Sequence, residues 1–125
     1  MPGVTLDTGA VIAIERADRR MQALLDEAHS AGLPIDIPAG ALAQAWRVGP
    51  RQARLARTLH LPNVTVAALD EPRAKAAGIL CGQRGTNDPI DASVVLNARQ
   101  RDHTVITTDP ADLRQLDPQL PIVAL

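Results

Sequence analysis

The sequence predicts an α/β protein in which helices cover both faces of a parallel β-sheet. Short β-branched runs, such as Val4–Leu6 and Thr104–Thr107, alternate along the chain with longer segments whose apolar residues recur at helical spacing. This alternation is typical of strands joined by helical crossovers, which produce a parallel sheet. With 125 residues, of which 46% are hydrophobic, the chain is expected to form a single domain, 1–125, around a substantial core.

The expected strands are short runs rich in Val, Ile and Thr, residues that favour extended structure. The first run leads directly into Asp7, and the fourth leads into Thr108 and Asp109. In open α/β sheets, ligands bind beyond the carboxyl ends of the strands, so these positions matter for function. The predicted strands are 4–6, 35–37, 64–67, 104–107 and 121–125.

The expected helices are marked by apolar periodicity and by residues that start or stop helices. Met21, Leu24, Leu25 and Ala28 recur at helical spacing, and Gly32 closes that helix. Prolines precede or open several of the others, and a Gly-Pro pair separates the third helix from the fourth. The predicted helices are 9–16, 19–30, 39–46, 51–60, 72–82, 89–102 and 110–115.

The composition excludes several classes of function. A formal net charge of −1 gives no overall attraction to nucleic acid or to an anionic membrane, so any nucleic-acid contact must come from a local basic patch or a metal ion. Cys81 is the only cysteine, which excludes an intramolecular disulfide and a cysteine-based zinc site. Trp46 is the only aromatic residue, which excludes a base-stacking platform.

The chain is expected to act in the cytoplasm. Its N-terminal residues include no basic region followed by a long apolar stretch, so no signal peptide is predicted. No apolar run approaches the roughly 18 residues that span a bilayer. The single cysteine fits a reducing compartment, where we expect it to be a small buried apolar group.

Three aspartates are the candidate functional residues. Asp7 and Asp109 follow predicted strands, and Asp91 lies in the first turn of the helix that Asp88 and Pro89 begin. Each of them alone is more readily explained as a helix cap. Together, at one edge of one sheet, they predict a cluster of carboxylates, which suits a hard cation such as Mg²⁺ or Mn²⁺.

Four motifs, LDTGAVIAIE, IPAGALAQAW, DPIDASVVLNAR and VITTDPADL, resemble in order and spacing those of the PIN domain, and in particular of the VapC-type toxins of bacterial toxin–antitoxin pairs. The resemblance extends from Val4 to Val123. It implies a three-layer α/β/α sandwich and cleavage of RNA that depends on Mg²⁺ or Mn²⁺. The four acidic positions of the family fall here on Asp7, Gln44, Asp91 and Asp109.

Gln44 departs from the family, which usually has glutamate at this position. An amide oxygen can accept a hydrogen bond or bind a metal, but it carries no charge, so a second metal ion becomes less favourable. The other interpretation of Gln44 is a polar residue that satisfies backbone groups near a helix start. Thr8 and Thr108 are expected to hydrogen-bond the carboxylates or the phosphate, and Asp88 to lie just behind the metal ligands.

Arg51, Arg54 and Arg57 recur at intervals of three and are candidates for contact with the RNA backbone. A solvated helix face explains them equally well. The histidines, His29, His60 and His103, show no metal-ligand spacing and are expected on the surface.

The sequence therefore predicts a metal-dependent endoribonuclease toxin. The family resemblance implies a cognate antitoxin protein as inhibitor, which would block the acidic cleft, and a homodimer. The alternative is a catalytically weak PIN-like domain that binds RNA or a protein without cutting, and Gln44 is the feature that favours it.

Overall fold

The computed structural model describes residues 2–125 and contains a five-stranded sheet in the order β3-β2-β1-β4-β5. Every neighbouring pair of strands is parallel, as predicted. Because the strand order reverses between β1 and β4, the carboxyl ends of these two strands form the topological switch point where α/β proteins bind ligands. The strands are β1 Val4–Leu6, β2 Ile35–Pro38, β3 Val64–Ala67, β4 Thr104–Thr107 and β5 Ile122–Ala124.

The helices agree with the predicted segments to within one or two residues at each end. The fifth helix extends furthest beyond its predicted range. Asp70 caps its start, and Gly85, with a left-handed φ of 68°, ends it. No helix within residues 2–125 is long and apolar enough to cross a membrane. The helices are α1 Thr8–Glu15, α2 Arg19–Ser30, α3 Ala39–Ala45, α4 Gln52–Leu59, α5 Glu71–Arg84, α6 Pro89–Arg101 and α7 Pro110–Leu116.

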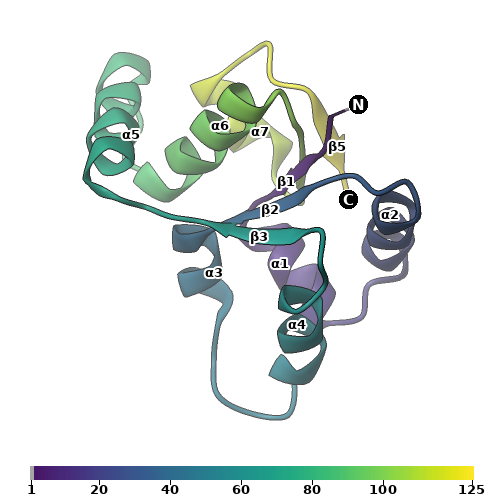
Figure 1. The fold of residues 1–125 in the computed structure, drawn as a ribbon. Helices are drawn as coiled ribbons and strands as arrows, with labels where there is room; N and C mark the ends of the chain where they lie inside the picture. The colour runs from purple at the N-terminus through teal and green to yellow at the C-terminus, as the bar shows by residue number, and fades with distance from the viewer. Residues whose placement is uncertain (1) are drawn as a thin grey trace.

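The molecule has three layers (Figure 1). Helices α1, α2 and α4 pack on one face of the sheet, and α5, α6 and α7 pack on the other. Helix α3 follows β2 directly and contacts both α1 and α6. Successive side chains of a strand point to opposite faces of the sheet. Leu6, Ile37 and Ile106 therefore pack in the core beneath α1, whereas Val105 packs in the second core under α6.

Polar side chains replace part of the core between α6 and the sheet. Asn97 of α6 donates from Nδ2 to Thr5 Oγ1 at 3.0 Å and to Asp36 Oδ2 at 3.1 Å. The Thr5 hydroxyl also bonds His103 Nδ1 at 3.0 Å, and Arg101 Nε lies 3.4 Å from Asp36 Oδ2. Each buried residue of this network gains at least one partner, which limits the cost of burying it, although Asp36 Oδ1 has none.

His103 was expected on the surface, and this expectation was wrong, since its side chain is only 1% exposed. Its bond partner Thr5 lies 98 residues away in sequence, so no local pattern reveals the burial. Burial lowers the pKa of His103 below the ordinary 6.5, and Arg101 lowers it further, although the Asp36 carboxylate acts in the opposite direction. The folded protein therefore favours the neutral imidazole more than the unfolded chain does.

We predict that His103 makes the protein less stable in mild acid. Because the folded-state pKa is lowered, the stabilisation is present above about pH 6.5 and is lost as the pH falls and the unfolded chain takes up the proton. Urea unfolding of wild-type protein and His103→Gln, between about pH 5 and pH 7, should show a steeper loss for the wild type. The exposed His60→Gln variant is the control. Identical slopes in all three proteins would contradict the prediction.

Candidate functional site

Asp7 lies at the switch point, immediately after β1, and is buried with 5% of its surface exposed. It is the N-cap of α1, where one carboxylate oxygen accepts from the Ala10 N–H at 2.9 Å. The Thr107 hydroxyl, at the end of β4, donates to the other oxygen. Burial raises the pKa of Asp7 and the charge of Asp109 raises it further, while the bonds from Thr107 and Ala10 lower it.

Asp109 follows β4 and lies beside Asp7. Its backbone N–H donates to Thr107 Oγ1 at 2.8 Å, so the same threonine holds the backbone of one aspartate and the side chain of the other. Although Asp109 occupies the N-cap position of α7, its side chain makes no capping hydrogen bond. The cap explanation considered for this residue therefore does not account for its carboxylate, which is left exposed at the edge of the sheet.

Asp91 reaches the same edge from α6. The cap of this helix is Asp88, whose side chain accepts from the Asp91 N–H at 2.9 Å, so Asp91 is not needed for capping. Burial raises the pKa of Asp91 to about 7, and the charges of Asp88, Asp7 and Asp112 contribute to the increase. The pKa of Asp112 is itself raised by its hydrogen bond to Asp109 and by the charge of that residue. These carboxylates thus form one electrostatically coupled group.

Two glycines allow the elements around the carboxylates to approach closely. A Cβ on Gly9, at the start of α1, would lie 2.0 Å from Thr108 Oγ1. A Cβ on Gly40 of α3 would lie 2.5 Å from Ile90 Cδ1, in the first turn of α6. Glycine at both positions brings α1 against the end of β4 and α3 against the start of α6.

Gln44 lies one turn after Gly40 on the same face of α3, and it therefore faces the assembled edge. The Thr8 hydroxyl, next to Asp7, donates to Gln44 Oε1 at 2.6 Å. The seven predicted pocket residues, Asp7, Thr8, Gln44, Asp88, Asp91, Thr108 and Asp109, are thus all carried by elements that meet at the switch point. Their chemical roles stay predictions.

The oxygen donors of this site suit a hard cation in their chemistry. Within residues 2–125, however, no three His, Cys, Asp or Glu side chains converge closely enough to hold a metal ion together. Ionised carboxylates repel one another, so a cation would have to draw Asp7, Asp91 and Asp109 towards the roughly 2 Å distance at which Mg²⁺ binds oxygen. The residues fit a metal by their donor type, and binding would require their carboxylates to move closer together.

Thr107 is a site residue that the sequence analysis did not identify. It was interpreted only as a β-branched strand former, yet its hydroxyl connects Asp7 and Asp109. The sequence feature that could have identified Thr107 as a site residue was its position at the end of a buried strand, just before a candidate aspartate. Leu6 pairs with Ile106 in the sheet, so the residues that follow them, Asp7 and Thr107, must be neighbours.

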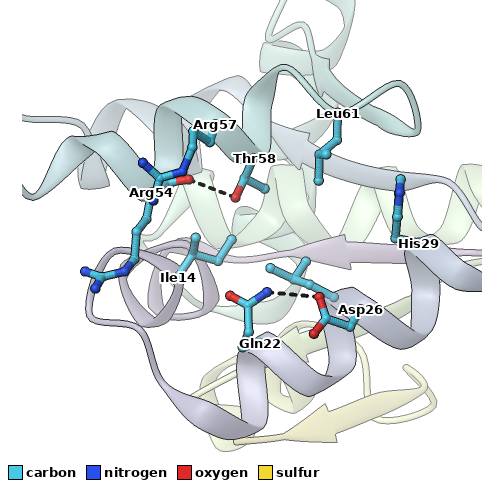
Figure 2. A pocket seen from close by; sticks show the side chains of 9 residues that line it. Ile14, Gln22, Asp26, His29, Arg54, Arg57, Thr58 and Leu61 are labelled. Carbon is cyan, nitrogen blue, oxygen red and sulfur yellow. Dashed lines mark hydrogen bonds between the residues drawn. The ribbon is translucent and has the colours of Figure 1, made fainter.

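The three predicted arginines lie at the start of α4 and along it, and two of them line a groove. Arg51 lies before α4 as its N-cap residue, whereas Arg54 and Arg57 line a groove of about 350 Å³ between α4 and α2. Figure 2 shows this groove, with Ile14 between the two helices and Asp26 on the opposite wall. The groove lies beside the last turn of α1, away from Asp7 at its start. Phosphate contact by these arginines is neither supported nor contradicted by this placement.

No protein-family model matches the sequence, and no curated protein matches it. Solved structures share the fold over nearly the whole chain. A chain in the crystal structure of VapBC2 from Rickettsia felis bound to a DNA fragment from their promoter has a TM-score of 0.72 and 17% identity, covering 98% of this chain and 98% of that chain. A chain in the DNA-bound VapBC from Salmonella typhimurium has a TM-score of 0.70 and 19% identity, covering 99% and 98%.

FitAcB from Neisseria gonorrhoeae contains a further similar chain, with a TM-score of 0.63 and 21% identity over 95% of each chain. Identities this low establish the fold only. The α/β/α sandwich implied by the motif resemblance is therefore confirmed, and so is the resemblance itself at the level of the fold.

We predict that Asp91→Asn stabilises the metal-free protein above neutral pH. The raised pKa of Asp91 means that its ionised form is unfavourable in the folded state, so its contribution to stability is lost as the pH rises through about 7. In EDTA at mildly alkaline pH, the amide variant should melt a few degrees higher than wild type. Glu27→Gln, which removes an exposed charge elsewhere, is the control. A lower melting temperature for Asp91→Asn would contradict the burial and repulsion inferred for this residue.

Proposed function

We propose that the protein is a VapC-type toxin that cleaves RNA in the cytoplasm as a Mg²⁺- or Mn²⁺-dependent endoribonuclease. The observation that carries this proposal is that Asp7, Asp91 and Asp109 belong to elements that meet at the switch point, where burial and the charges of neighbouring aspartates raise the pKa values of Asp7 and Asp91. A carboxylate cluster at this place in a parallel sheet is costly without a ligand, which argues for a cationic ligand in function.

In this proposal Asp7, Asp91 and Asp109 hold the cation. When bound, the cation would supply Lewis-acid stabilisation of the phosphate and activation of water. Thr107 fixes the geometry, since its hydroxyl orients the Asp7 carboxylate while its oxygen anchors the Asp109 backbone. Asp88 starts the helix that presents Asp91, and Thr108 borders the site from the side of Gly9.

A cognate antitoxin protein is the proposed inhibitor. The structures with similar chains are two-component assemblies by their names, VapBC2, VapBC and FitAcB. An acidic edge of this kind would attract a cationic side chain, so a partner that inserts an arginine could neutralise the carboxylates and exclude the metal. A homodimer is part of the same proposal and rests on the family resemblance alone.

The second candidate function is a PIN-like domain that binds RNA or protein with little or no cleavage. Two observations favour it. Gln44 contributes no charge, and no three metal-binding side chains within residues 2–125 already converge. Metal-dependent cleavage by the purified protein distinguishes the two functions.

We predict that the purified protein cleaves a mixed RNA pool with Mg²⁺ or Mn²⁺ and not with EDTA. Asp91→Asn and Asp109→Asn should each lower the cleavage rate at least a hundredfold, because each removes a charged ligand of the proposed cation. Both are cleaner tests than Asp7→Asn, since Asp7 also caps α1. Glu27→Gln is the matched control and should cleave at the wild-type rate. Full activity in either aspartate variant would refute the assignment.

If Arg51, Arg54 and Arg57 contact RNA phosphates, replacing all three with alanine should weaken RNA binding and reduce its salt dependence. Each lost phosphate contact lowers the slope of log affinity against log salt by about 0.7 for a single strand. The matched control replaces Arg16, Arg19 and Arg20 with alanine, which removes three exposed charges just before and at the start of α2. An unchanged slope would leave the arginines as a solvated helix face.

A further inference from the structure

The orientation of the Gln44 amide indicates which of its groups is available to a ligand. Its oxygen, Oε1, accepts the Thr8 hydroxyl at 2.6 Å, so the acceptor that could bind a cation is already engaged. Within residues 2–125, Nε2 of the same amide has no hydrogen-bond partner. The side chain is exposed, and the free group that it offers at the acidic edge is therefore a donor.

In the part of the chain that the structure describes, few side-chain donors remain at this edge, and besides Gln44 Nε2 the exposed Thr108 hydroxyl is the one that borders it. Ionised carboxylates only accept hydrogen bonds, and the site is built mainly from aspartates. The Thr8 hydroxyl proton is given to Gln44, and the Thr107 hydroxyl proton is given to Asp7. An RNA phosphate carries a negative charge and needs donors, which the carboxylates cannot supply and would otherwise repel.

We propose that the Gln44 side-chain amide binds the substrate, donating from Nε2 to a non-bridging oxygen of the RNA phosphate at the acidic edge, and does not bind the metal. This inference rests on the proposed function. Thr8 is the positioning residue, because its hydroxyl holds Oε1 and so leaves Nε2 available to a ligand. The neutral amide also does not repel the phosphate, as a fourth carboxylate would.

The test separates RNA affinity from metal affinity. Gln44→Met keeps the length of the side chain and removes the amide, and Gln83→Met makes the same change at an exposed position on α5. Each protein is titrated with Mn²⁺ by calorimetry and with a labelled mixed-sequence RNA in EDTA by fluorescence anisotropy. The KM and kcat for RNA cleavage are then measured with Mn²⁺.

We expect Gln44→Met to raise KM about tenfold and to weaken RNA binding in EDTA, because a hydrogen bond to a charged group is lost. Its Mn²⁺ affinity should equal that of wild type and of Gln83→Met. Thr8→Val should weaken RNA binding by a smaller factor, and Thr8→Ser should restore it. Gln44→Glu should weaken RNA binding more than Gln44→Met, while its Mn²⁺ affinity is equal or higher.

Two results would overturn the inference. Equal RNA affinity and KM in Gln44→Met and Gln83→Met would mean that the amide does not touch the substrate. A loss of Mn²⁺ affinity in Gln44→Met would mean that the amide is a metal ligand. If the wild-type protein cleaves no RNA with either metal, the proposed function fails instead, and the inference fails with it.

Discussion

The hydrogen bond from Thr107 to Asp7 joins the ends of the two central strands, and the geometry of the site depends on it. Leu6 and Ile106 are paired in the parallel sheet, so the next residue of each strand leaves the sheet at the same place. There the Thr107 hydroxyl meets the Asp7 carboxylate, and its oxygen receives the Asp109 N–H. One side chain thereby fixes both aspartates relative to the sheet, while the Ala10 N–H fixes the other oxygen of Asp7. These two donors lower the pKa of Asp7 and so partly offset the burial that raises it.

Much of the fold could be predicted because its determinants are local. Short β-branched runs became the strands, and a proline or a capping aspartate started helices such as α5 and α6 close to the expected residues. Asp7 and Asp109 could be placed together because strand ends in a parallel sheet share an edge. The position of Gln44 could not be predicted from strand ends, since only the motif resemblance connected its segment with the aspartates. In the structure, its hydrogen bond with Thr8 puts it next to Asp7.

What could not be predicted depends on contacts between distant segments. His103 is polar and follows a helix, which is typical of a surface residue, yet the Thr5 hydroxyl and the Asp36 carboxylate lie beside it in the fold. Asp36 illustrates the same limit, because an aspartate within a strand gives no sign that Asn97 will donate to it across the layer. Such networks specify how α6 sits on the sheet, and α6 carries Asp91. The buried polar residues thus help to position the site without belonging to it.

The site combines groups that favour opposite partners. The aspartates attract cations, and their burial together with their mutual repulsion makes the folded chain less stable when the site is empty and ionised. A phosphate substrate needs the reverse, namely donors and a cation between it and the carboxylates. Gln44 adds no negative charge to this edge, and the Thr8 hydroxyl engages its amide oxygen. On the proposed function, a change at this position should therefore alter the affinity for an RNA phosphate more than the affinity for a cation, without any change in the strands or helices that build the edge.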